Sequence, residues 1–313
     1  MRASPTTMAK RSRVASAARL WSRRHHYRFL WGYFFIAPWV IAFLAFDLIP
    51  TLSGFYLSLT RYSIVGSPKW VGLANYSKMF FKDHLYWKSL YNTAYYSFLS
   101  VPLGVVSGFT LALLLNHPIR GTTLYRSVYY LPTVVPSVAS AIVWLWIFDT
   151  REGILNFFIS FLGVGPIRWL TSPTWSKPAL IIMSLWGLGG SMVIYLAGLQ
   201  GIPEELYDAA EIDGAGAIGR LIYVTIPLMT PIIFFNLVMS IIGSFQVFNN
   251  AFIMTEGGPL NSTLFYVLHL FTNAFTFLKM GYAAAMAVVL FIIVLIVTLV
   301  VQRSSGRWVH YEV

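Results

Sequence analysis

The chain has 313 residues, of which 57% are hydrophobic and only 11% are charged, and its mean hydropathy is +0.67. Soluble domains carry roughly 25% charged residues, so this chain has too little polar surface to cover a water-soluble globule of its size. The composition therefore indicates a membrane protein. The absence of cysteine excludes disulfides, thiolate metal sites and cysteine nucleophiles.

The net charge of +11 is unevenly distributed along the chain. No acidic residue precedes Asp47, and the first 28 residues form a basic arm. A basic arm suits either nucleic acid or an anionic membrane face. Because an apolar run follows directly, we interpret residues 1–28 as a cytoplasmic arm that contacts membrane lipid, and we expect no nucleic-acid partner. The arm contains eight cations: Arg2, Lys10, Arg11, Arg13, Arg19, Arg23, Arg24 and Arg28.

Six uncharged stretches reach the length of about 20 residues that a membrane-spanning helix needs. They predict an all-α integral membrane protein with six transmembrane helices in a domain of residues 29–302, followed by a cytoplasmic tail of residues 303–313. The stretches are Phe29–Phe46, Ser89–Ile119, Ser127–Phe148, Pro178–Pro203, Leu221–Thr255 and Met280–Gln302. A seventh stretch, Gly257–Leu278, contains many polar groups that would need internal partners in hydrocarbon. We therefore expect a loop and an amphipathic segment at the membrane surface there.

Six spans place both termini on the same side of the membrane. Lys and Arg residues next to the first span usually determine the orientation, because cytoplasmic flanks are enriched in them. The basic arm therefore predicts that the N-terminus and the C-terminus are both cytoplasmic.

Five of the eleven acidic residues lie within ten positions, in the predicted loop between the fourth and fifth spans. Pro203 suits the first turn of a helix, the acids that follow it complement the helix dipole, and Gly214 and Gly216 suit its end. The spacing predicts a short helix with small side chains. On spacing alone, an ordinary solvated turn is an equally good interpretation. The five acids are Glu204, Glu205, Asp208, Glu211 and Asp213.

The segment Leu206–Ala215, followed by Pro227, resembles the EAA loop of ABC importer permeases. The rest of the chain is similar to the sugar branch of that family, the maltose and glycerol-3-phosphate type, and to the first permease of the pair. The matching segments are Trp70–Tyr76, Asn92–Thr93, Leu113–Asn116, Arg120–Gly121, Tyr130–Pro132, Gly153–Asn156, Ala197–Pro203, Gly243–Phe248, Thr255–Pro259 and Gly281–Ala285. One residue departs from the pattern, since Asp208 stands where Glu is usual.

The resemblance implies a type I ABC importer permease fold in which the EAA loop, residues 200–231, contains a cytoplasmic coupling helix that binds a separate ATPase. It also implies a bacterial or archaeal cytoplasmic membrane protein with four partners: a second permease in a heterodimer, two ATPase subunits and an extracytoplasmic sugar-binding protein. The coupling residues would be Glu204, Glu205, Leu206, Tyr207, Asp208, Ala209, Ala210, Asp213, Gly214 and Pro227.

No nucleotide site is expected in this chain, which contains no Gly-x-x-x-x-Gly-Lys-Ser/Thr loop. The glycines of Gly187–Gly190 instead suit close packing of helices. We therefore predict that the chain is not an enzyme and binds no cofactor, with ATP and Mg²⁺ held by the partner ATPases.

Polar residues within spans tend to face the bundle interior or a pore. Amides, hydroxyls and aromatic rings suit a neutral sugar, whereas an ion pump would display carboxylates. Here the spans contain none, because Asp47 is expected at a helix end beside Pro50. The alternative is that these groups bond neighbouring helices. The candidate substrate-pathway residues are Ser184, Trp186, Ser191, Tyr195, Ser244, Gln246, Asn249 and Asn250.

Two other function classes fit the sequence less well. An ion-coupled secondary sugar transporter would be expected to show two similar halves and intramembrane charges, and the sequence has neither. A membrane enzyme would need a metal or nucleophile constellation. The six scattered histidines provide no metal-ligand spacing, so no metal site is expected.

Overall fold

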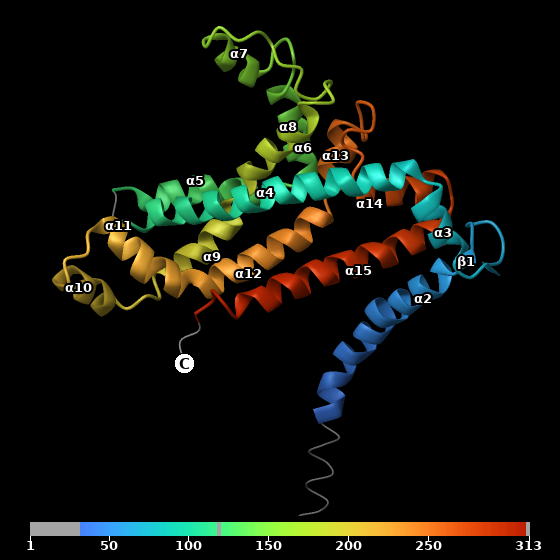
Figure 1. Ribbon diagram of the computed structural model, residues 1–313, viewed down its shortest axis with the longest axis horizontal. Helices are drawn as coiled ribbons and strands as arrows, with labels where there is room; N and C mark the ends of the chain where they lie inside the picture. Colours follow the sequence, from blue (N-terminus) through green and yellow to red (C-terminus); the bar gives the residue numbers. More distant parts are fainter. Residues whose placement is uncertain (1–31, 118–119, 311–313) are drawn as a thin grey trace, which may run out of the picture. The chain divides into compact units, whose positions relative to one another are not determined.

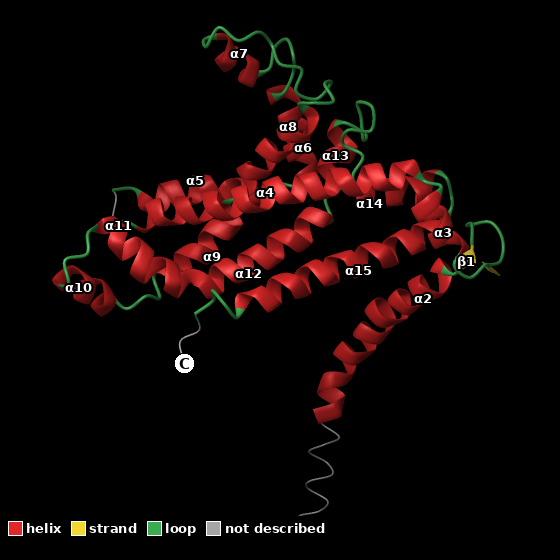
Figure 2. Cartoon of the chain, in the orientation of Figure 1, coloured by secondary structure: helices red, strands yellow, loops and turns green. Residues whose placement is uncertain are grey.

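The computed structural model describes residues 32–117 and 120–310 (Figures 1 and 2). The predicted basic arm of residues 1–28 lies outside the described residues. The described residues divide between two compact units, with the boundary between Tyr56 and Leu57. Most of the described residues are helical, and the strands among them form one antiparallel pair, β1 (Thr60–Arg61) with β2 (Lys69–Trp70).

The first apolar helix runs from Gly32 to Ser58 and is longer than predicted. It includes a π-helical stretch, η1 (Phe43–Leu48), followed by α2 (Ile49–Ser58). The expectation that Asp47 lies at a helix end is therefore wrong. The wider π turn lets the helix continue through Pro50, whose nitrogen carries no proton to donate.

Three long helices of the second unit lie side by side (Figure 1): α4 (His84–Asn116), α12 (Ile226–Phe245) and α15 (Met280–Ser305). α11 (Ala217–Arg220) and the π-helical η3 (Leu221–Thr225) precede α12, and the three form one continuous apolar helix. A turn after α12 leads into α13 (Asn249–Met254). Small and flexible side chains, including Ala112, Met192 and Met229, are fully buried where α4, α9 (Gly189–Leu199) and α12 meet.

Two predicted spans are bent rather than straight. The predicted span Ser127–Phe148 is two helices, α5 (Thr122–Val134) and α6 (Ser137–Ile147), at 102° to each other. Pro136 stands at this break and cannot donate a backbone hydrogen bond. The described residues thus contain four helices long and apolar enough to cross a membrane, or six if each bent pair counts as one span.

The second bent pair comprises α8 (Ser176–Ser184), the 3₁₀ turn η2 (Leu185–Gly187) and α9 (Gly189–Leu199), with a bend of 46°. A side chain at Gly189 would collide with the carbonyl oxygen of Tyr129 on α5. The expected close packing of these glycines is therefore confirmed at Gly189.

The seventh uncharged stretch is buried or half-buried over most of its length, although Leu260 and residues 275–278 are exposed. Its helices, α14 (Tyr266–Phe271) and the π-helical η4 (Thr272–Thr276), are too short to span a membrane and pack against α4 and α15. Tyr266, Leu268, His269, Asn273 and Ala274 are buried, and the polar groups of the stretch find partners inside the protein. The Thr263 hydroxyl donates to the Gly258 carbonyl at 2.7 Å, and the hydroxyls of Ser262 and Ser176 lie 2.8 Å apart. These polar groups therefore form hydrogen bonds within the protein, whereas the sequence suggested that they would contact water at the membrane surface.

α4 fixes this stretch through two buried side chains that lie one after the other. The Asn92 amide donates to the carbonyls of Asn261 (2.8 Å) and Leu264 (3.0 Å). The neighbouring Thr93 hydroxyl accepts the backbone N–H of Tyr266 at 2.9 Å. Irregular backbone can therefore stay inside the bundle without unsatisfied groups.

The remaining elements lie in the connections. α3 (Ala74–Phe81) follows the β-hairpin, and α7 (Ile154–Ser160) lies in the long connection between α6 and α8. Buried Asn156 holds that connection, since its amide donates to the Ile167 carbonyl (2.9 Å) and its oxygen accepts from the Trp169 indole (3.0 Å).

The predicted C-terminal tail is partly helical and partly packed. α15 extends to Ser305, beyond the predicted end of the span at residue 302. The chain then turns back onto α12, where the Trp308 ring meets Phe234 edge-on at 5.9 Å and the His310 N–H donates to the Thr230 hydroxyl at 2.9 Å. Residues up to His310 are therefore part of the folded unit.

Asp83 joins three helices at one end of the second unit. One carboxylate oxygen accepts the N–H of Leu85 at 2.9 Å and caps α4. The other accepts the Tyr282 hydroxyl of α15 at 2.5 Å and lies 3.1 Å from Nε2 of His269 on α14. Burial raises the pKa of Asp83, but the hydrogen bonds from Tyr282 and His269 outweigh it and hold the pKa below its ordinary value.

This lowered pKa predicts an acid-sensitive contribution to stability. A carboxylate with a depressed pKa stabilises the folded state above its unfolded-state value of about 3.9, and that contribution is lost as the pH falls through the folded value. We expect Asp83→Asn to lower the melting temperature of the purified protein at pH 6 and to narrow the gap to wild type at pH 3. Asp149→Asn is the control, because that exposed carboxylate only caps its own turn. An equal gap at both pH values would contradict the assignment.

Candidate functional site

The acid-rich loop forms a short helix, α10 (Glu204–Ile212), as predicted (Figure 1). Pro203 does not lie in the first turn, because it has extended backbone angles and caps the helix from outside. The Pro203 carbonyl oxygen accepts a hydrogen bond from the backbone N–H of Leu206 at 3.3 Å. Glu204 and Glu205 occupy the first turn, where negative charge stabilises the helix.

Gly214 ends the helix as the sequence predicted. Its φ of +82° is the left-handed conformation that glycine adopts without strain. The N–H of Gly214 donates to the Glu211 carbonyl at 3.0 Å, and the N–H of Ala215 donates to the Ala210 carbonyl at 2.9 Å. This pair of bonds is the Schellman motif, which satisfies the last carbonyls of a helix.

α10 is tied to the helix that follows it. The Tyr207 hydroxyl lies 3.1 Å from the Thr225 hydroxyl at the start of α12. The Arg220 guanidinium pairs with the Glu211 carboxylate at 2.7 Å. Thr225 is buried, whereas the ion pair is exposed and contributes little by itself. These contacts connect α10 with α12 across the turn that Gly214 begins.

None of the α10 residues is buried. The predicted coupling residues Asp208, Ala209 and Asp213 are exposed, and Pro227 lies in the first turn of α12. The loop also exposes apolar side chains that the sequence reasoning missed. Apolar residues in an acid-rich loop were the available signal. The missed side chains are Ile212, Ile218 and Tyr223, which are 87%, 74% and 80% exposed. Leu206, which was predicted as a coupling residue, is exposed as well.

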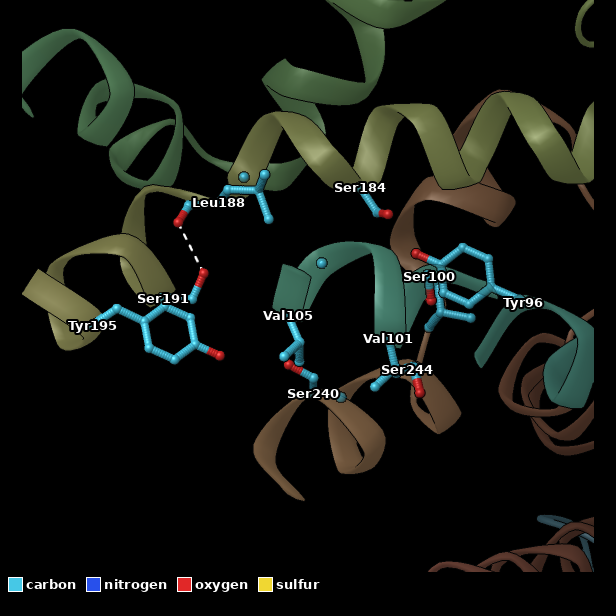
Figure 3. Close-up of a pocket in the computed structure, with 14 residues that line it drawn as sticks. Tyr96, Ser100, Val101, Val105, Ser184, Leu188, Ser191, Tyr195, Ser240 and Ser244 are labelled. Atoms are coloured by element: carbon cyan, nitrogen blue, oxygen red, sulfur yellow. Dashed lines mark hydrogen bonds between the residues drawn. The ribbon is translucent and has the colours of Figure 1, made fainter. Parts of the chain in front are cut away.

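A second feature is a cavity of about 310 Å³ where α4, the α8–α9 bend and α12 meet (Figure 3). The described residues that line it include no charged side chain. Its polar lining consists of hydroxyl groups, from Tyr96, Ser100, Ser184, Ser191, Tyr195, Ser240 and Ser244.

Four of the eight predicted pathway residues line this cavity: Ser184, Ser191, Tyr195 and Ser244. The other four do not. Trp186 meets Trp144 edge-on at 6.1 Å. Gln246, Asn249 and Asn250 lie beyond the end of α12 at Phe245, in a turn and in α13, which packs against α6. The Asn249 amide donates to the Ser137 hydroxyl of α6 at 3.0 Å.

The sequence reasoning missed the contribution of α4 to the cavity. Tyr96, Ser100 and Gly104 follow one another at intervals of four residues and therefore share a helical face. Asn92 and Ser89, one and two turns before Tyr96, extend this polar stripe. A polar stripe along an apolar span was the signal that could have identified it.

Tyr195 stands out among the lining residues because its side chain is fully buried. In the described part of the chain its hydroxyl has no hydrogen-bond partner, and Figure 3 shows it pointing towards the cavity. The hydroxyls of Ser184, Ser191 and Ser244 donate to carbonyls of their own helices, so their lone pairs remain available. The cavity can therefore both donate to and accept from an uncharged polar ligand.

The geometry of Gly214 generates a prediction about α10. No atom lies within 4 Å of the position that a Cβ would take there, so Gly214→Ala introduces backbone strain without a collision. Such strain costs about 1–2 kcal/mol, and we expect amide exchange at residues 214 and 215 to accelerate roughly 5- to 30-fold. Gly214→Asn is the matched control, because Asn tolerates this conformation better. Equal acceleration in both variants would contradict the assignment.

Known proteins resemble this chain over most of its length. Residues 100–310 match the family model described as "Binding-protein-dependent transport system inner membrane component". The chain is 45% identical to the probable ABC transporter permease protein YesP of Bacillus subtilis, over 90% of this chain and 92% of that protein. It is 33% identical to the trehalose/maltose transport system permease protein MalF of Thermococcus litoralis, over 88% and 94% respectively.

A solved structure supports the fold. The chain superposes on a subunit of a bacterial alginate ABC transporter, crystallised with a periplasmic protein bound to alginate pentasaccharide, with a TM-score of 0.81. The sequence identity is 22%, and the match covers 94% of this chain and all of that one. The chain therefore belongs to the family of binding-protein-dependent transport system inner membrane components, the permeases of ABC importers.

Proposed function

We propose that this chain is the first permease of a pair that forms the pathway for a neutral sugar or oligosaccharide in an ATP-driven importer. The sugar is delivered by an extracytoplasmic binding protein, and two ATPase subunits supply the energy. The observation that carries the proposal is the cavity between α4, α9 and α12, which is lined by hydroxyls and by no charged side chain among the described residues. Hydroxyl groups match the donors and acceptors of a sugar.

Coupling to the ATPases rests on α10. Its exposed acidic and apolar side chains suit a groove on another protein, in which the apolar groups would be buried. Through Tyr207 and Thr225, α10 is linked to α12, and α12 contributes Ser240 and Ser244 to the cavity. A displacement of α10 by an ATPase would therefore be transmitted to the cavity wall through a single helix.

In this proposal the chain holds no nucleotide, and ATP and Mg²⁺ bind the partner ATPases. Both termini face the cytoplasm, which puts α10 on the same side as the ATPases. Family membership argues against the ion-coupled secondary transporter, because this family consists of subunits of ATP-driven importers.

Reconstitution tests the function directly. The chain co-purified with its partner permease and ATPases in proteoliposomes should import sugar only when binding protein and ATP are supplied. The chain alone should import none. Uptake by the chain alone, driven by a proton or sodium gradient, would establish the secondary transporter instead.

Tyr195→Phe tests the cavity. The variant keeps the ring and removes a hydroxyl that has no partner in the described structure, so the melting temperature should not fall. Loss of a sugar contact worth about 1–2 kcal/mol should raise the KM for transport roughly 5- to 30-fold.

The matched control for this variant is Tyr266→Phe. Its hydroxyl is also buried but donates to the Met286 carbonyl at 2.8 Å, outside the cavity. We expect this variant to lower the melting temperature and to leave KM unchanged. An unchanged KM in Tyr195→Phe would remove Tyr195 from the pathway.

A further inference from the structure

A second cavity, of about 440 Å³, lies at the end of the second unit opposite α10 (Figure 1). Its walls are the β-hairpin, α3 and the turn that leads into α15. Three cations line it, Arg61, Lys78 and Lys279, and no acidic side chain is found among its described lining residues. It is chemically the reverse of the uncharged cavity between α4, α9 and α12.

These cations have no acidic partner in residues 32–117 and 120–310, where the ion pairs involve only Arg220 with Glu211 and His269 with Asp83. The amino groups of two of them lie over aromatic rings instead. Lys78 Nζ is 4.8 Å from the centre of the Tyr282 ring, and Lys279 Nζ is 4.9 Å from that of Phe277. Cation–π contacts hold the amino groups in place without neutralising them.

Asp83 lies behind the cavity and does not line it. Its carboxylate is already occupied by Tyr282, by His269 and by the first turn of α4. The positive charge of the cavity is therefore left for an external anion.

The walls of the cavity are joined by specific contacts. The N–H of Gly281 donates to the Tyr62 carbonyl at 3.1 Å, and a side chain at Gly281 would collide with the Thr60 carbonyl oxygen. The Asn75 amide donates to the carbonyls of Ser58 and Thr60, both at 2.8 Å. The hairpin, α3 and the start of α15 thus form one preorganised site.

Each cation stands next to the end of an apolar helix long enough to cross a membrane. Arg61 follows the helix that ends at Ser58, Lys78 precedes α4, and Lys279 directly precedes α15. Such positions lie at the level of lipid headgroups. The enrichment of cations on the cytoplasmic side of membrane proteins does not account for three of them gathered in one cavity at the end opposite α10.

We propose that this cavity binds the phosphate of an anionic phospholipid headgroup in the leaflet opposite α10. Arg61, Lys78 and Lys279 contact the phosphate oxygens, and the apolar rim of Val71, Ala74 and Leu278 meets the start of the acyl chains. A lipid bound there joins the hairpin to α15 and would stabilise the end of the bundle where Asp83 lies.

Native mass spectrometry of the full chain, purified in detergent with its accompanying subunits, tests the proposal with phosphatidylglycerol as probe. The variant Arg61→Gln/Lys78→Gln/Lys279→Gln should retain about 100-fold less of this lipid than wild type. The matched control is Lys69→Gln/Lys82→Gln/Lys88→Gln, which removes the same charge at the same end from residues that do not line the cavity. It should retain phosphatidylglycerol within about threefold of wild type.

Two further measurements test the site even if the triple variant folds poorly. Ser63→Trp fills the cavity without changing its charge and should also release the lipid. Phosphatidylcholine should not replace phosphatidylglycerol in wild type. Equal lipid retention by wild type and the triple variant, or equal loss in the matched control, would overturn the site. Displacement of the lipid by micromolar inorganic phosphate would assign the cavity to a soluble phosphate and overturn the lipid.

Discussion

Internal satisfaction of polar groups is the constraint on which the second unit depends. A chain with 11% charged residues forms a bundle in which buried donors and acceptors have little water to turn to. Asn92 shows the solution, because its buried amide binds two carbonyls of an irregular segment far along the sequence. Thr93, the next residue, accepts the first N–H of α14. Two consecutive side chains of α4 thus allow non-helical backbone to lie inside the bundle.

Two cavities contain polar groups that have no such partner within the described structure. The hydroxyl of Tyr195 is buried beside a cavity and lacks a partner in the described structure. The cations around the second cavity lack acidic partners there as well. A buried polar group without a partner is costly, so a ligand hydroxyl would complete the site at Tyr195. The exposed cations of the second cavity keep their charge available for an anion. One site offers hydroxyls for an uncharged molecule, and the other offers positive charge for an anion.

α12 connects the two parts of the proposed transport mechanism. Thr225, at the end of η3 directly before α12, contacts α10, and the first turns of α12 contact the returning C-terminal segment at Thr230. Its last turns bring Ser240 and Ser244 to the cavity. A single packed helix is a stiff connection, which fits the transfer of a rigid-body displacement between two distant sites.

Sequence reasoning succeeded where a property depends on neighbouring residues. The extent of α10, its stop at Gly214 and the close approach at Gly189 follow from helix dipoles, backbone conformation and side-chain size. It was less successful at helix ends. The first helix continues twelve residues beyond its predicted end, and the predicted third span is sharply bent at Pro136. A π turn and the packing around a proline depend on contacts that a linear pattern does not contain.

The amino-acid sequence alone determined the class of the protein, its apolar helices and the acidic loop, because hydrophobic length and local charge are properties of consecutive residues. Only the tertiary structure decided that Tyr96 and Ser100 share a cavity with Tyr195, and that the segment of residues 262–266 is buried. It also brought together Arg61, Lys78 and Lys279, which are far apart along the chain. Such sites arise where distant segments pack against one another, so their composition depends on the fold rather than on local sequence.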